Sequence, residues 1–228
     1  MVLQLSASSE IVAPYQFFGE GRAVDLMPRL TKAGYNPAGI AFIIDQRQIA
    51  FTDARNNFDI TLWTGDSAGT DEEGGLLLTL DSLLLRQLTQ ESSLVNGALK
   101  LDNNQWQELK ADGEHSLYLN PPEVEAAHEK GYVFENKKFV PANETVAKVW
   151  YHLNRGRNIR SYVQIVSEAS KNNYIVRLCF DRSKLGAPTL RSLALEGVNK
   201  NSDISSVNYL NISFGLIVGR SIKKKGGI

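Results

Sequence analysis

Residues 148–166 read KVWYHLNRGRNIRSYVQIV. Two runs rich in β-branched and aromatic residues flank the segment NRGRN, which has Gly156 at its centre. Runs of this composition on either side of a loop of about five residues are typical of a β-hairpin. The sequence therefore predicts two antiparallel strands here, with Arg155 and Arg157 at the tip of the loop between them.

Strand alternation assigns the side chains of this predicted hairpin to two faces. The outer face carries Trp150 opposite Tyr162 and His152 opposite Arg160. Aromatic rings interleaved with cations are typical of sheets that stack the bases and neutralise the phosphates of single-stranded nucleic acid. The alternative is an aromatic pair that stabilises the sheet and lies beneath another element.

The rest of the C-terminal half completes the predicted fold. NYIVRLCF (residues 173–180) predicts a third strand, and NYLNISFGLIVG (residues 208–219) predicts a last one. Between them, PTLRSLALEG (residues 188–197) predicts a helix, because proline opens it and glycine ends it. The order in this half is β-β-β-α-β. We expect an α+β, β-rich protein with mainly antiparallel sheets and a few short helices.

The N-terminal half is predicted to mix helices and strands. Asp25 and Gly34 delimit one helix, leucines at helical spacing indicate another, and a Pro-Pro pair opens a third. The predicted helices cover residues 24–34, 78–91 and the segment from 121, the predicted strands cover 39–45, 48–53, 58–63, 98–101 and 116–119, and a hairpin covers 132–140.

The charges are divided unevenly along the chain. The first 136 residues hold 9 Lys and Arg against 20 Asp and Glu, whereas the remaining residues hold 16 against 5. We expect an acidic α+β half at residues 1–131 and a basic antiparallel-sheet half at 132–228, although one continuous domain is also possible. An asymmetry of this size favours a charged partner, or pairing of one half with the other.

Several classes of site have no signal in this sequence. The chain lacks the glycine-rich phosphate loops and the ligand spacing of a zinc site, so we predict no catalytic residue, cofactor or metal. The acidic loop at residues 65–75 is predicted to be solvated, and cation binding there is left open. Cys179 is the single cysteine, which favours a cytoplasmic location. No apolar run is long enough to cross a membrane.

These observations predict a non-catalytic nucleic-acid-binding accessory protein that uses a basic, aromatic-bearing sheet face, with the acidic half facing protein partners. The predicted nucleic-acid-binding residues are Lys148, Trp150, His152, Arg155, Arg157, Arg160, Tyr162, Arg177, Lys223, Lys224 and Lys225.

Three alternatives remain at this point. In the first alternative, the chain is a structural subunit that assembles head to tail through its acidic and basic faces. In the second alternative, the chain is a nuclease, because Asp102, Glu108 and Lys110 are similar to the D…E-x-K arrangement that holds magnesium in many nucleases. Or the two halves neutralise each other within one monomer, in which case the asymmetry concerns folding alone.

Overall fold

A computed structural model describes residues 15–52, 60–183, 185–207, 209–211 and 213–221. Its largest feature is an 11-stranded sheet in which antiparallel pairs predominate. The strands of this sheet are β1 (Tyr15–Arg22), β2 (Tyr35–Pro37), β3 (Leu62–Thr70), β4 (Leu76–Thr79), β5 (Leu94–Val95), β6 (Ala98–Lys100), β7 (Ser116–Leu119), β11 (Leu178–Cys179), β12 (Thr189–Leu195), β13 (Ile204–Ser205) and β14 (Phe214–Ser221).

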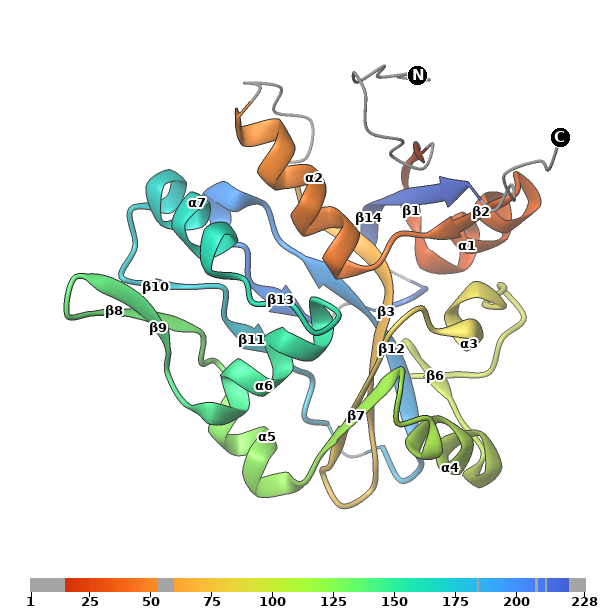
Figure 1. The fold of residues 1–228 in the computed structure, drawn as a ribbon. Helices are drawn as coiled ribbons and strands as arrows, with labels where there is room; N and C mark the ends of the chain where they lie inside the picture. Colours follow the sequence, from red (N-terminus) through yellow and green to blue (C-terminus); the bar gives the residue numbers. More distant parts are fainter. Residues whose placement is uncertain (1–14, 53–59, 184, 208, 212, 222–228) are drawn as a thin grey trace, which may run out of the picture.

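The path of the sheet runs β1-β14-β3-β12-β13-β11, with the other strands joined at its sides. The first and last strands, β1 and β14, are antiparallel neighbours, so the two ends of the described chain lie together (Figure 1). A second sheet has three strands in the order β10-β8-β9, and it lies to one side of the large sheet. Its strands are β8 (Tyr132–Glu135), β9 (Lys138–Pro141) and β10 (Tyr174–Ile175).

Helices form two groups around the large sheet (Figure 1). One apolar cluster joins the sheet to α2, α5, α6 and α7, and a second joins it to α1, α3 and α4. The helices are α1 (Ala23–Lys32), α2 (Ile40–Thr52), α3 (Leu83–Arg86), α4 (Asn103–Ala111), α5 (Pro121–Ala127), α6 (Glu144–Leu153) and α7 (Arg160–Ser170), with a short 3-10 helix η1 at Val198–Lys200. In the described ranges, every helix is too short or too polar to span a membrane.

The predicted α+β class and the mainly antiparallel pairing are confirmed. The predicted helix at 24–34 corresponds to α1, the helix after the Pro-Pro pair to α5, and the hairpin at 132–140 to β8 and β9. The α5 helix begins with a capping box, in which the side chains of Asn120 and Glu123 each accept a hydrogen bond from the other residue's backbone N–H.

The predicted hairpin at residues 148–166 is wrong, because this stretch forms the helices α6 and α7. In α6 the buried side chains are Val146, Val149, Trp150 and Leu153, which have the i, i+3, i+4, i+7 spacing of a helical face. Ile159, Tyr162, Val163 and Val166 repeat the same spacing at α7. Burial at helical spacing outweighs the strand propensity of the β-branched residues.

Two further segments form secondary structure of the other type from the one predicted. Strands were predicted at 39–45 and 48–53, but Ile40–Thr52 forms α2, in which Ile40, Ile43, Ile44 and Arg47 are buried at the same helical spacing. Residues 188–197, predicted as a helix, include the strand β12. This strand lies between β3 and β13 and is buried along its whole length. A strand buried on both faces lacks the alternation that identifies strands in a sequence. The C-terminal order β-β-β-α-β is therefore not the observed one.

The acidic and basic halves share one sheet and meet through ion pairs. Strands β1, β3 and β4 come from the acidic half, and they lie in the same sheet as β12 and β14 from the basic half. Within the described residues, four ion pairs cross between the halves, which are Lys148–Glu123, Arg155–Asp81, Arg157–Asp45 and Arg182–Glu125. Charges of opposite sign are thus joined within one chain, as in the alternative of internal neutralisation.

Asp66 in the predicted acidic loop is a buried residue of β3. Its carboxylate oxygens accept the backbone N–H of Ile40, at the start of α2, and the backbone N–H of Asp81, at 2.6 and 2.9 Å. Burial raises the pKa of Asp66 to about 6, although these two hydrogen bonds oppose the shift. Gly39 leaves room for the carboxylate, since a Cβ there would lie 2.9 Å from its oxygens.

Candidate functional site

A groove of about 960 Å³ lies between the β8–β9 hairpin and the helices α6 and α7. We call it the hairpin–helix groove. In Figure 1 the β8–β9 hairpin lies at the side of the molecule opposite α1. The lining residues are Tyr132, Phe134, Lys137, Lys138, Phe139, Val140, Pro141, Ala147, Lys148, Tyr151, Asn158, Ile159, Arg160, Val163, Gln164, Ser167 and Glu168.

The hairpin wall of the groove carries a pair of phenylalanine rings. Phe134 and Phe139 face each other across β8 and β9, with ring centroids 5.2 Å apart, and Phe134 is half exposed. The turn between the strands consists of Asn136 and Lys137, with φ of 50° and 64°. Two successive positive φ values define the type I′ turn that matches the twist of a hairpin. The tight turn therefore leaves the amino group of Lys137 at the tip of this wall.

The helical wall presents the outward faces of α6 and α7. Lys148 and Tyr151 are one helical turn apart on α6, and the side chain of Tyr151 is 58% exposed. Arg160, Gln164 and Glu168 follow at intervals of four residues on α7, so they form one row along the groove. Within this row the Gln164 side-chain amide donates to a Glu168 carboxylate oxygen at 3.1 Å.

Positive charge dominates the groove. Lys137, Lys138, Lys148 and Arg160 line it, and Glu168 is the one carboxylate in the lining. Three of these cations have no ion pair within the described residues, because only Lys148 has an acidic partner there, Glu123 of α5 at 3.0 Å. The lining thus combines aromatic surface with exposed cations, and it includes neither a histidine nor a cysteine. This chemistry suits binding of an anionic group with apolar parts.

Burial also affects the tyrosine at the base of the hairpin. It raises the pKa of Tyr132, and the nearby positive charge of Arg160 opposes this shift. The chain also approaches itself closely here, since a Cβ at Gly131 would lie 2.3 Å from the backbone oxygen of Ile175. Glycine at this position lets β8 pair with β10, and this pairing fixes the hairpin beside α7.

The predicted aromatic platform is not exposed. Trp150 is buried and donates its ring N–H to the backbone oxygen of Val176 at 3.0 Å. Tyr162 is also buried, and its hydroxyl contacts Ser202 and accepts from the guanidinium of Arg47 at 2.7 Å. Both rings belong to the core, as in the alternative of a structural pair, although they do so from helices. Neither ring is accessible to a nucleic-acid base.

The predicted arginines at the tip lie in the loop between α6 and α7, and carboxylates of the acidic half pair with both. Arg155 Nη2 lies 2.6 Å from Asp81 Oδ2. Arg157 binds both carboxylate oxygens of Asp45, at 3.0 and 3.2 Å. Their charges hold this loop against the acidic half, so they are not available as a free phosphate-binding surface.

The remaining predicted contacts are dispersed. Arg177 pairs at 2.6 Å with Asp203, a buried carboxylate. His152 lines a separate hollow beside His115, and burial lowers its pKa, so its charge is disfavoured. Lys148 and Arg160 line the hairpin–helix groove, and they are the members of the predicted set that the structure brings together. Lys223, Lys224 and Lys225 lie outside the described residues.

Two of the three nuclease-like residues make structural contacts. Asp102 caps α4 by accepting the backbone N–H of Gln105 at 2.8 Å, and Lys110 lies over the ring of Tyr118, 3.7 Å from its centroid. Asp71 of the predicted acidic loop accepts a hydrogen bond from the Tyr118 hydroxyl at 2.9 Å. Among the described residues, no cluster of three or more His, Cys, Asp or Glu could hold a metal ion.

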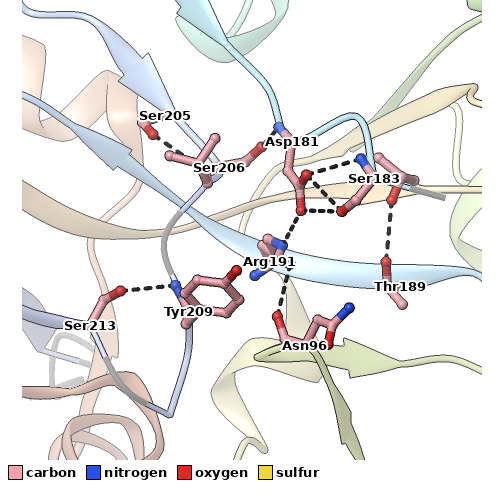
Figure 2. Close-up of polar contacts among 11 residues, drawn as sticks. Asn96, Asp181, Ser183, Thr189, Arg191, Ser205, Ser206, Tyr209 and Ser213 are labelled. Carbon is pink, nitrogen blue, oxygen red and sulfur yellow. Dashed lines mark hydrogen bonds and ion pairs between the residues drawn. The ribbon is translucent and has the colours of Figure 1, made fainter. Parts of the chain in front are cut away.

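A second polar cluster surrounds Arg191 on β12 (Figure 2). Its guanidinium lies 2.8 Å from Asp181 Oδ2, donates to the backbone oxygen of Asn96 at 2.9 Å and lies 5.0 Å from the ring centroid of Tyr209. Asp181 also accepts from the backbone N–H and hydroxyl of Ser183. These contacts join three loops, and Arg191 itself is buried. The cluster thus holds loops together.

Comparison with known proteins gives one informative match. No family model matches the chain, and no curated protein matches its sequence. The structure is similar to a solved structure described as "Accommodation of massive sequence variation in Nanoarchaeota by the C-type lectin fold". The TM-score is 0.64 at 15% identity, and the match covers 92% of this chain and 97% of that one. The chain therefore has a C-type lectin fold.

The predicted function is overturned by these findings. The fold is that of a C-type lectin rather than a basic strand-binding sheet, and the aromatic rings on which nucleic-acid binding depended lie in the core. Head-to-tail assembly through opposite charges loses support as well, because Arg155, Arg157 and Arg182 form ion pairs within the chain.

Sequence reasoning missed the aromatic residues that line the groove, chiefly Phe134, Phe139 and Tyr151. The hairpin that carries the two phenylalanines was predicted, but it was not recognised as one wall of a site. Strand alternation places Tyr151 on the opposite face from Trp150 and His152, whereas the helical period places it outward beside Lys148. A test of both periods on residues 144–170 is the signal that could have found this wall.

Proposed function

We propose that this chain is a non-catalytic binding protein whose hairpin–helix groove takes up an acidic segment of another protein. The observation that carries the proposal is the exposure of Phe134 and Tyr151 beside Lys138 and Arg160 in one hollow. Exposed rings supply apolar contact area at low entropic cost, and the cations favour a partner of opposite charge.

The size of the groove supports an elongated ligand. Its volume of about 960 Å³ is near the upper limit of about 1,000 Å³ for small-molecule pockets. The lining extends from the hairpin tip at Lys137 to Pro141 and along two turns of α7. Side chains at the rim of the groove are exposed, so a peptide segment can lie along the groove without entering a deep cavity.

The fold is consistent with this proposal without determining it, since one fold hosts many functions. The similar solved structure is described as accommodating massive sequence variation. A frame of that kind suits a protein whose function depends on exposed side chains rather than on a fixed catalytic set. The cytoplasmic location stays a prediction, and a single cysteine supports it.

The proposal is tested by selection from a random peptide library displayed against the full chain. We expect the selected peptides to be acidic and to contain apolar residues, and their affinity to fall as salt is added. Reversal of two groove charges in the double variant Lys138→Glu, Arg160→Glu should lower the affinity for the selected peptide about thirtyfold, because each lost attraction is of the order of 1 kcal/mol.

The matched control is Lys32→Glu, which reverses an exposed charge of α1 on the far side of the molecule. It should leave peptide affinity unchanged. Selected peptides that are neutral or basic would contradict the proposal. So would an equal loss of affinity in the Lys32 variant and the groove variant.

A further inference from the structure

The strand β9 lies at the end of the three-stranded sheet. The order is β10-β8-β9, so among the described strands β9 pairs with β8 alone. An edge strand presents backbone N–H and C=O groups that can pair with another chain. The residues of β9 from Lys138 to Pro141 also line the hairpin–helix groove, so this edge and the groove belong to one surface.

Backbone pairing identifies which groups of β9 face outward. The backbone N–H of Ala142 donates to the oxygen of Gly131 at 2.9 Å. In an antiparallel ladder, hydrogen-bonded and non-hydrogen-bonded pairs alternate. Phe139, opposite Phe134, is therefore at a non-hydrogen-bonded position. Its backbone groups point away from β8.

The opposite strand confirms this alternation. The backbone N–H of Phe134 donates to the oxygen of Asn173 at 3.2 Å, on the side of β10. Phe134 thus directs its backbone groups to one side of the hairpin, and Phe139 directs its own to the other. Pro141, two residues after Phe139, has a carbonyl oxygen on the same outer side but no N–H.

We infer that the bound segment adds a strand to the outer edge of β9, with the N–H and C=O of Phe139 as its central pairing groups. This inference rests on the proposed function and names the mode of recognition. Side chains of a strand alternate between its two faces. Every second side chain of the added strand would point into the groove towards Tyr151, and the cations at the rim would favour acidic residues among them.

The pair of variants Phe139→Ala and Phe139→Pro tests this mode. Both remove the same ring, but proline also removes the outward N–H. Because that N–H faces away from β8, proline at this position leaves the β8–β9 hydrogen bonds intact. The probe is the acidic peptide selected from the library. We expect it to bind the proline variant roughly three- to tenfold more weakly than the alanine variant, as for loss of one backbone hydrogen bond.

Thermal unfolding of both variants, followed by circular dichroism, verifies that the hairpin and the rest of the fold remain. In the wild-type chain, the Phe139 amide should also exchange its hydrogen more slowly once the peptide is bound. Equal affinity of the two variants for the peptide, with an unprotected Phe139 amide, overturns strand addition but leaves the proposed function standing. A library that yields no acidic peptide overturns the proposed function, and this inference with it.

Discussion

The two walls of the groove differ in how the protein supports them. The helical wall rests on two complete apolar faces, with Trp150 and Tyr162 among the largest buried side chains of the described chain. The hairpin wall buries Tyr132 and packs Phe139 partly against the same core. A rigid wall thus faces a lightly anchored one. Such a site keeps its position while one side can adapt to the shape of a ligand.

The largest effect is expected at Trp150, a buried residue of α6 in the helical wall. Trp150→Ala should lower the free energy of unfolding by about 3–5 kcal/mol, because it leaves a cavity and an unpaired backbone oxygen at Val176. Denaturant titration measures this loss. A loss below about 1 kcal/mol would mean that the helical wall is not anchored through this ring.

The next effect concerns how the helical wall is tied to the sheet. Arg155 of its loop pairs with Asp81, whose backbone N–H donates to Asp66. Burial raises the pKa of Asp66 to about 6, above an unfolded value of about 3.9. Between these two pKa values, Asp66 therefore keeps a proton in the folded chain that it has lost in the unfolded chain. The stabilisation is complete below about pH 4 and disappears as the pH rises through about 6.

The matching experiment compares wild type with Asp66→Asn, which does not titrate. Between pH 4 and pH 7 the wild type should lose about 2 kcal/mol relative to the variant. Denaturant titrations at the two pH values give this difference. Parallel pH profiles for the two proteins would contradict the raised pKa.

Tyr151 separates the binding role of the helical wall from its structural role. Tyr151→Ala removes an exposed ring, so the free energy of unfolding should change by no more than about 0.5 kcal/mol. Affinity for the selected acidic peptide should fall about tenfold, because exposed tyrosines at a binding site contribute on the order of 1–2 kcal/mol. Isothermal titration and denaturant titration measure the two effects. Unchanged affinity would remove the helical wall from the site.

The smallest effect is expected in the turn of the hairpin wall. Lys137 has a φ of 64°, which costs a residue with a Cβ more than it costs glycine. Lys137→Gly creates the preferred Asn-Gly pair and should slow hydrogen exchange in β8 and β9 by the equivalent of about 0.5–1 kcal/mol. Faster exchange in the variant would show that the Lys137 side chain stabilises the hairpin. The exchange of α6 and α7 should be unaffected.

The sequence alone identified the hairpin wall but not the helical wall. The hairpin at residues 132–140 was predictable, because its strands are short and Asn136 marks the turn. The two helices were misread because Val, Ile and Tyr favour strands locally, whereas their burial follows the period of a helix. Local composition and tertiary burial thus disagreed, and burial decided the structure.

The charge layout was also readable in amount but not in arrangement. The excess of basic residues after residue 136 is real, but its effect depends on which carboxylates lie within reach. Arg157 is 112 positions from Asp45 in sequence, and they form a bidentate pair in the fold. Only the tertiary fold, which places α2 beside the loop between α6 and α7, brings these two residues together. The groove cations without an ion pair among the described residues, such as Arg160, could not be distinguished from the paired ones in advance.

The central claim is that an acidic segment occupies the hairpin–helix groove. The most direct measurement is the mapping of backbone amide NMR shifts as the selected acidic peptide is added to the wild-type chain. We predict that the shifts concentrate at Phe134, Phe139, Tyr151 and Gln164, on both walls of the groove. Shifts concentrated instead around Asn96 and Tyr209, or spread evenly over the basic surface, would contradict this account.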